Sequence, residues 1–477
     1  MILSPFDSIL ENKVRFGKYQ YVTYFFASLT HFSDGSEIVG LSILLPVLKN
    51  EWKISDDDQS ILGSVLFFGI LVGSILGGYV SDKLGRKTAL LYSSIIQFVI
   101  GVLSTLVQSV SLFILMRGLF GLIIGFTLPL APSFASELTP VNIRGRGVVF
   151  VNFFFSIGSF YAVIVGKFCL DSLNSGNWKA MLIWCSLPSL VVWIGTLIFI
   201  KESPRFLIAT NRIQEGVDVL NYMASVNNPE SHQAISDSEV DELRSWQRDL
   251  FSEAQDVDIR ALIEPKHKRI TILLSLMWFT LNFAFYGMTF ILPFILAKFE
   301  ASQQGGTQGL DGILYTIAGE VPSVLIGIYI IEKESFGRKG TTFYSALITV
   351  FLFIIASFSS VSMLIALLTI GRMFLKLSFS IMYPMTTEFY PTPIRTVGLG
   401  FTSGVGRLGS SIMPIILIGL LNIDVMLPIL SFGLVMTLHV FAAYMLPFDT
   451  RGRQLDLLED DQNRDRGRNT YIALKEL

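Results

Sequence analysis

The chain has 477 residues, of which 51% are hydrophobic and only 16% are charged, and its mean hydropathy is +0.58. An average soluble protein has about 25% charged residues, so this chain lacks the polar side chains that a water-exposed surface of its size requires. The net charge of −2 provides no basic surface for nucleic acid. Cys169 and Cys185, the two cysteines, lie in apolar runs and offer neither a disulfide framework nor a cysteine metal site. The composition predicts a membrane protein and excludes a soluble enzyme.

Twelve apolar segments reach the length of about 20 residues that a helix needs to cross the hydrocarbon core of a bilayer. The predicted spans are 20–48, 60–81, 88–107, 112–135, 147–170, 180–200, 270–297, 312–332, 341–359, 361–386, 398–421 and 424–446. The sequence therefore predicts an all-α membrane protein with two six-helix halves, 20–200 and 270–446. A central loop at 201–269 joins them, and the tails at 1–19 and 447–477 flank them.

Basic residues in short loops predict the orientation, because they are enriched on the cytosolic side. The richer side of the bundle holds Lys83, Arg86, Lys87, Arg144, Arg146, Lys333, Arg338, Lys339 and Arg395, and the other side holds Lys49, Lys53, Lys179 and Lys298. Both tails and the central loop fall on the richer side. We therefore expect a multi-pass protein with cytosolic termini, in the plasma membrane or an intracellular vesicle membrane.

The central loop is polar but has helical patterning. Ile213, Val217 and Leu220 recur at helical spacing, and Ser236 with Glu239 forms a capping-box pattern before a second apolar series. Short helices beneath the membrane fit this pattern. A solvated linker with no role in transport is the alternative.

Two pairs of loops repeat between the halves. The loop after the second span holds Gly78, Asp82, Gly85, Arg86 and Lys87, and the loop after the eighth holds Glu334, Gly337, Arg338 and Lys339. The loop after the fourth span holds Glu137, Pro140 and Arg144, and the loop after the tenth holds Glu388, Pro391 and Arg395. In this second pair, Glu precedes Pro by three positions and Arg by seven. Internal repeats of this kind are typical of secondary transporters.

The loop at 78–87 is similar to the signature loop of the major facilitator superfamily, and the resemblance covers essentially all twelve spans. The motifs that resemble one branch of it are Asp34-Gly-Ser-Glu37, Glu202-Ser-Pro-Arg-Phe-Leu207, Trp278-Phe279, Tyr286-Gly287, Gly398-Leu-Gly400, Ser403-Gly404, Arg407-x-Gly409 and Pro447-Phe-Asp-Thr-Arg-Gly452-Arg453. That branch holds organic-ion transporters, synaptic vesicle glycoprotein relatives and aromatic-acid:proton symporters. One departure is Ile330, which replaces the leading Gly of the second signature loop.

The resemblance implies that the repeated loops form a cytosolic gate. Its expected residues are Gly78, Asp82, Gly85, Arg86, Lys87, Glu137, Arg144, Glu334, Gly337, Arg338, Glu388 and Arg395. Asp82 is expected to accept hydrogen bonds from helix-end amides and from an Arg of the opposite half, which closes the cytosolic side when the carrier faces outward. Glu137 with Arg144, and Glu388 with Arg395, are expected to pair across the loops.

Charges inside the first half predict proton coupling. A charge at the bilayer centre costs about 2.5–3.5 kcal/mol on insertion scales, so each one requires a reason. His31, Asp34 and Glu37 are three residues apart and share one helical face. We expect Asp34 to exchange a proton, with Glu37 beside it and Arg117 of the fourth span as a relay or gating partner. The alternative is that Asp34 only bonds a neighbouring helix and Arg117 only pairs an acid.

Cations inside the second half predict an anionic substrate. The expected substrate-binding residues are Tyr286, Glu320, Arg372, Lys376 and Arg407. In organic-ion carriers, the position matched by Arg407 is acidic for cations and basic for anions, so the resemblance implies an organic anion. A guanidinium also matches the geometry of a carboxylate. Arg407 could instead support packing through an internal acid, and Glu320 could simply face a water-filled cavity.

We therefore expect a secondary active transporter of a small organic anion, coupled to protons, that works by alternating access as a monomer in the lipid bilayer. The alternatives are an organic cation, a sugar or phosphate as substrate, or a vesicle-type receptor or regulator that does not transport. No nucleophile–base pair, phosphate loop or metal cluster is evident in the sequence, so no enzyme activity, cofactor or metal is expected.

Overall fold

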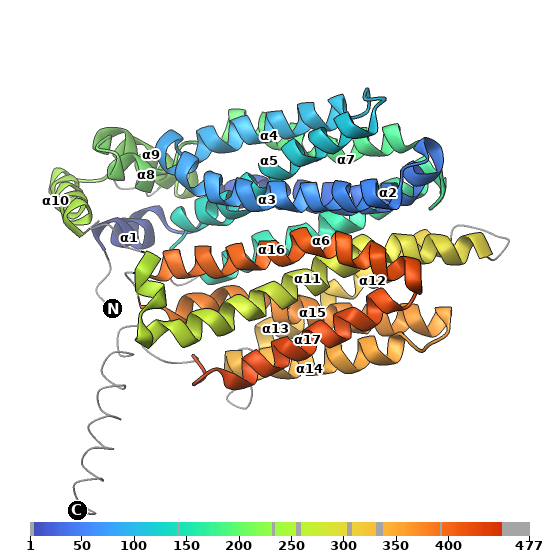
Figure 1. Cartoon of the computed structure of the whole chain (residues 1–477). Helices are drawn as coiled ribbons and strands as arrows, with labels where there is room; N and C mark the ends of the chain where they lie inside the picture. Colours follow the sequence, from blue (N-terminus) through green and yellow to red (C-terminus); the bar gives the residue numbers. More distant parts are fainter. Residues whose placement is uncertain are drawn as a thin grey trace, which may run out of the picture.

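The computed structural model describes residues 4–140, 144–230, 234–253, 259–302, 308–330, 337–391 and 394–450. Long helices dominate this part of the chain, and they form two bundles that lie side by side (Figure 1). The first bundle consists of α2 (Lys18–Trp52), α3 (Asp56–Leu84), α4 (Arg86–Leu103), α5 (Val110–Glu137), α6 (Arg144–Cys169) and α7 (Trp178–Phe199). We call it the N-terminal half. A two-stranded hairpin, β1 (Leu170–Ser172) and β2 (Ser175–Gly176), connects α6 to α7.

The C-terminal half repeats this arrangement with one interruption. Its helices are α11 (Pro265–Ser302), α12 (Gln308–Ala318), α13 (Glu320–Ile330), α14 (Gly337–Ala356), α15 (Val361–Phe389), α16 (Arg395–Ile423) and α17 (Leu427–Met445). Together, α12 and α13 occupy the place of the predicted eighth span and meet at Gly319. The twelve-helix architecture predicted from the apolar segments is confirmed, with the eighth span divided into two half-helices.

Ten helices of the described part are long and apolar enough to cross a membrane by length and composition. The remaining positions of the bundle belong to α2 and to the α12–α13 pair. α2 is long enough, but the polar run from Ser33 to Glu37 lowers its hydropathy. α12 and α13 have only 11 residues each. Both exceptions lie where charged residues enter the centre of the bundle.

A close helix crossing positions the centre of the N-terminal half. A Cβ atom at Gly158 on α6 would lie 1.9 Å from the carbonyl oxygen of Phe32 on α2. Only glycine permits this approach, because every other side chain would clash with the facing backbone. The crossing brings the polar run of α2 beside the α6 residues that follow Asn152.

The two halves are joined by polar contacts at one end of the bundle. Lys167 of α6 forms an ion pair with Asp311 of α12. The side-chain amide of Asn422 on α16 donates to the Asp56 carboxylate on α3 at 3.0 Å. The backbone N–H of Leu173 donates to Glu300 of α11 at 3.1 Å. We call this end the joined end, and the end that carries the central loop the central-loop end.

Short helices cover the central-loop end of the N-terminal half. They are α8 (Pro204–Ala209), α9 (Ile213–Asn227) and α10 (Asp237–Glu253), whereas the 3₁₀ turn η2 (Ile259–Ile263) that follows them packs on α11 and α16 of the C-terminal half. α9 and α10 coincide with the segments that have helical patterning. The Ser236 N–H donates to the Glu239 carboxylate at 2.8 Å, as in a capping box.

The N-terminal segment packs against these helices. It folds into α1 (Pro5–Ile9) and a π-helical turn, η1 (Leu10–Val14). The Phe6 ring stacks on Trp246 of α10, with ring centroids 5.7 Å apart. Lys13 forms an ion pair of 2.5 Å with Glu239, also on α10. Residues 4–14 and α8–α10 thus form one helical cap on the N-terminal half (Figure 1).

Candidate functional site

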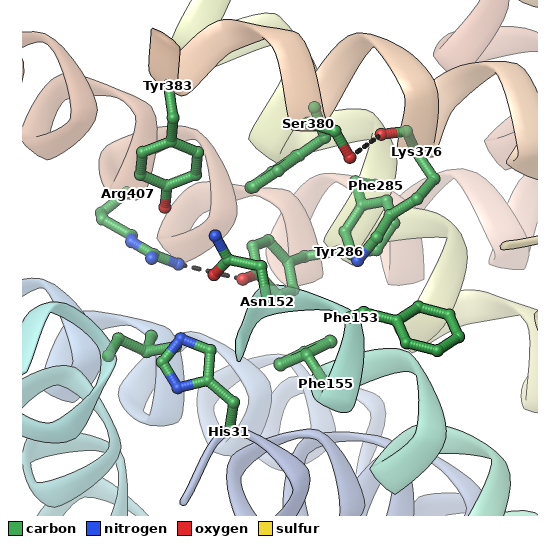
Figure 2. A pocket seen from close by; sticks show the side chains of 12 residues that line it. His31, Asn152, Phe153, Phe155, Phe285, Tyr286, Lys376, Ser380, Tyr383 and Arg407 are labelled. Carbon is green, nitrogen blue, oxygen red and sulfur yellow. Dashed lines mark hydrogen bonds between the residues drawn. The ribbon is translucent and has the colours of Figure 1, made fainter. Parts of the chain in front are cut away.

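A cavity lies between the two halves, near the middle of the long helices. Its lining residues come from α2, α5, α6, α11, α15 and α16, and ten of the twelve are labelled in Figure 2. They are His31, Leu128, Asn152, Phe153, Phe155, Phe285, Tyr286, Lys376, Phe379, Ser380, Tyr383 and Arg407. Aromatic rings form most of the wall, and the polar groups among them can orient a ligand.

Tyr286 of α11 is the centre of the aromatic wall. Its ring lies 5.4 Å from Phe285, 6.3 Å from Phe379 and 6.4 Å from Phe155, measured between centroids. Phe155 belongs to α6 of the N-terminal half, so the cluster spans both halves. Nearly perpendicular ring pairs at these distances are favourable contacts. The Tyr286 hydroxyl remains available to a polar neighbour.

Arg407 of α16 provides that neighbour. Its Nη1 donates to the Tyr286 hydroxyl at 3.1 Å, and its guanidinium lies 5.6 Å from the centre of the Tyr286 ring. Only 8% of the residue is exposed. A buried charge normally has a charged partner. Within the described ranges, no carboxylate forms an ion pair with Arg407.

The other two predicted cations share an acid. The Glu320 carboxylate at the start of α13 accepts from Arg372 Nε at 2.7 Å, and Lys376 Nζ lies 3.5 Å from it. Ser156 of α6 also donates to Glu320, and this bond crosses between the halves. Glu320 and Arg372 do not line the cavity, whereas Lys376 does. The expectation of three convergent cations with Glu320 beside the substrate is therefore corrected: Glu320 neutralises Arg372 at a helix break behind the cavity.

The acids of the N-terminal half have different partners. Glu37 lies 3.6 Å from Arg117 and accepts a hydrogen bond of 2.5 Å from Ser186. Asp34 is fully buried and accepts from Gln97 at 3.1 Å and from Thr127 at 3.0 Å. In the described part, Arg117 therefore pairs with Glu37, and Asp34 has no cationic partner.

The first repeated loop forms a cluster at the central-loop end. Arg86 contacts Asp82 at 2.7 Å and Glu137 at 3.0 Å. Glu202, which follows α7, accepts from the backbone N–H of Lys87 at 3.0 Å. Gly85 has a φ of +92°, a conformation that favours glycine. These contacts all lie within the N-terminal half.

The second repeated loop forms the equivalent cluster. Arg338 Nε donates to Glu388 at 3.1 Å. Asp449, which follows α17, accepts from the backbone N–H groups of Arg338 at 3.2 Å and of Lys339 at 2.8 Å. Gly337 has a φ of +57°. The internal sequence repeat is therefore also a repeat of geometry.

The described residues of the expected gate have partners within their own halves. Asp82 binds Arg86, and its expected contact with an Arg of the opposite half belongs to the state in which the carrier faces outward. Glu137 and Glu388 bind Arg86 and Arg338, the Arg residues of the signature loops. Arg395 Nε donates to the Tyr390 carbonyl oxygen at 3.4 Å. The pairings of Glu137 with Arg144 and of Glu388 with Arg395 stay predictions. Glu334 and the Arg144 side chain lie outside the described part. A Cβ atom at Gly78 would meet nothing within 4 Å.

The family follows from sequence comparison. A profile described as "Sugar (and other) transporter" matches residues 15–461. The chain belongs to this transporter family. It is a multi-pass membrane protein of the major facilitator superfamily, and its family transports sugars and other organic solutes.

Similar proteins cover nearly the whole chain. The synaptic vesicle 2-related protein of Pongo abelii is 29% identical over 476 residues, which cover 93% of this chain and 80% of that protein. Organic cation/carnitine transporter 7 of Arabidopsis thaliana is 26% identical over 479 residues, which cover 92% of this chain and 93% of that protein. The inward open conformation of the xylose transporter XylE from E. coli has a TM-score of 0.72 at 18% identity, with 92% and 99% of the two chains covered. This structural likeness confirms the major facilitator fold.

Sequence reasoning missed several residues that shape this transporter's centre and gate. Asn152, Phe155 and Tyr383 line the cavity, and Glu202 and Asp449 cap the signature loops. Asn152 could have been found as a polar side chain inside an apolar run. Glu202 and Asp449 stand in the quoted motifs that follow the sixth and twelfth spans. Nothing local marks Phe155 or Tyr383 among the many aromatic residues of the helices.

Proposed function

We propose that this transporter carries a small organic anion together with a proton, by alternating access between its two halves. The observation that carries the proposal is Arg407, a buried guanidinium in a cavity that the described residues provide with cations but no carboxylate. An anion would supply the missing partner.

Charge argues against an organic cation or a sugar as the substrate. Arg407 and Lys376 both line the cavity, and of the two only Lys376 contacts an acid, Glu320, which does not line the cavity. An organic cation would meet repulsion that a low-dielectric interior strengthens. A neutral sugar would leave the guanidinium without a counter-charge. A carboxylate can accept two parallel N–H bonds from Arg407, and aromatic walls suit an apolar body attached to it.

Asp34 is the proposed proton site. Neutral donors hold its carboxylate, and its neighbour Glu37 already has Arg117. A buried carboxylate without a cation is neutral at lower cost than charged, which favours uptake of a proton. Asp34 lies one helical turn from His31, which lines the cavity. Asp34 is thus close enough to the substrate for proton binding and substrate binding to affect each other.

The contacts between the halves support alternating access. Polar contacts join the halves at the joined end, whereas the clusters of Arg86 and Arg338 each remain within their own half. We infer a conformation that opens toward the central-loop end. We place that end, with both termini, in the cytosol on the basis of the basic loops. The names of the similar proteins favour a vesicle membrane, with the plasma membrane as the alternative.

The test is a ligand screen on the purified, full-length protein. Organic anions, organic cations and sugars are added at several pH values, and thermal stability is measured. A ligand at 100 times its Kd stabilises the folded state by about 2.7 kcal/mol. Anions should stabilise the protein, and Arg407→Ala should remove this effect while Arg407→Lys retains part of it. Stabilisation by cations or sugars alone would contradict the proposal.

A further inference from the structure

One polar atom of the cavity has no partner. His31 of α2 is 2% exposed, and its Nδ1 makes no hydrogen bond. Among the described cavity-lining residues, only His31 has a buried side-chain nitrogen or oxygen that makes no hydrogen bond. Leaving a buried polar group without a hydrogen bond destabilises the protein. A ligand group that bonds to Nδ1 would remove this cost.

The surroundings of His31 narrow the kind of group that fits. Asn152 of α6 lies beside it in the cavity wall (Figure 2). In a neutral imidazole, one nitrogen donates and the other accepts. A hydroxyl group can serve as donor or acceptor, so it can bond to Nδ1 in either tautomer.

Three polar groups of the same wall already have partners within the protein. The Tyr286 hydroxyl accepts from Arg407, and Lys376 contacts Glu320. The Ser380 hydroxyl donates to the Lys376 carbonyl oxygen at 3.0 Å. Among the polar atoms of the described cavity wall, Nδ1 of His31 is the fully buried one that a second polar group of the ligand would newly satisfy. Figure 2 shows His31 and Arg407 facing the same space from opposite halves.

We propose that His31 is a specificity-determining residue that binds a hydroxyl group of the anion whose carboxylate Arg407 binds. This inference rests on the proposed function. The substrate class is then a hydroxylated organic anion that contacts both halves at once. A ligand shifts a conformational equilibrium only through contacts that differ between the two states. A molecule held by α2 and α16 together has such contacts when the halves move.

The test compares benzoate with its three hydroxylated forms, which differ only in the position of the hydroxyl group. The Kd of each acid is measured for the wild type, His31→Phe and His31→Leu. The wild type should bind one hydroxybenzoate about two- to tenfold more tightly than benzoate, the value of one net hydrogen bond. Both variants should lose this preference and bind benzoate and that hydroxybenzoate equally, and a measurable Kd for benzoate shows that they are folded.

His439 of α17 offers a matched control. It is another fully buried histidine with an unpartnered ring nitrogen, but it does not line the cavity. His439→Phe should retain the preference for the hydroxylated acid. A preference that survives in His31→Phe and His31→Leu would overturn the inference, as would equal binding of all four acids by the wild type. If the wild type binds none of these acids but binds cations or sugars, the proposed function fails and the role of His31 with it.

Discussion

The two halves have similar loops but different centres. At the central-loop end, Arg86 with Glu137 and Arg338 with Glu388 occupy equivalent places and make similar contacts. In the middle, the buried residues differ in sign. Of the acids Asp34 and Glu37, only Glu37 pairs with a cation, Arg117. In the C-terminal half, Glu320 pairs with both Arg372 and Lys376, and Arg407 lines the same cavity as Lys376. The loops of the two halves are therefore alike, whereas the buried charged residues at their centres differ.

This difference indicates that the N-terminal half binds the proton and the C-terminal half binds the anion. The described centre of the N-terminal half has one acid in excess, and that of the C-terminal half has an excess of bases. A proton on Asp34 would neutralise the first excess, and an anion at Arg407 would reduce the second. Because unpaired buried charge is costly, the loaded centre is better compensated in both halves than the empty one.

The largest expected effect tests the excess of buried basic residues in the C-terminal half. Arg407→Ala should weaken anion binding by more than 100-fold, because an unpaired buried charge costs about 3–5 kcal/mol. Arg407→Lys keeps the charge but loses the planar two-bond geometry, so its loss should be smaller. Direct binding measurements of the Kd of the organic anion for each variant test this prediction. Unchanged affinity in the alanine variant would assign Arg407 to packing alone.

The second effect concerns stability and contrasts the two kinds of buried acid. Glu320→Gln leaves Arg372 and Lys376 without their acid and should destabilise the protein by about 3 kcal/mol. Asp34→Asn removes no ion pair and should cost less than about 1 kcal/mol. Denaturation of both purified variants gives the comparison. Equal losses would show that the two acids have the same structural role.

The third effect tests the acid excess. Asp34→Asn mimics the protonated acid and should abolish proton-driven accumulation. One pH unit is equivalent to ~1.4 kcal/mol, or about a tenfold gradient, which this variant should not build. Counterflow exchange of labelled for unlabelled substrate should continue in the same vesicles, since it requires no net proton movement. A variant that still concentrates substrate under a pH gradient would limit Asp34 to a structural role.

The smallest effect concerns the shared loops. Asp82 has 67% of its side chain exposed, and exposed ion pairs contribute about 0–1 kcal/mol. Asp82→Asn should therefore lower the transport rate by less than about fivefold. Arg86→Ala also loses Glu137 and should reduce it further, and both variants should remain folded in the membrane. Uptake into vesicles that contain each purified variant gives the two transport rates. Normal rates in both variants would show that Asp82 and Arg86 are not part of the gate.

The fold was largely predictable because membrane spans are long apolar segments that the sequence states directly. The division of the eighth span was not, since 312–332 reads as one apolar run and only Gly319 with Glu320 marks the break. The segment before the first span reads as a mixed-charge tail. Its apolar positions Phe6, Leu10 and Val14 nevertheless have helical spacing and pack on the central-loop helices.

The candidate site was less predictable because pairing depends on distances in space. The sequence shows that Asp34 and Glu37 share a helical face, but it does not show that Arg117 forms its ion pair with Glu37 and not with Asp34. Likewise, Arg372 and Lys376 are visible as intramembrane cations, whereas their common partner Glu320 lies on another helix. Composition identified the charged residues, and packing determined which charge has no partner.

The helical cap has a consequence for synthesis. Lys13 and its partner Glu239 are 226 residues apart. At a translation rate of about 5–20 residues per second, Glu239 leaves the ribosome roughly 10–45 s after Lys13. During that interval the whole N-terminal half is inserted while Phe6 and its apolar neighbours have no central-loop helices to cover them. Residues 4–14 are made before the helices of the N-terminal half but are therefore among the last to reach their final place.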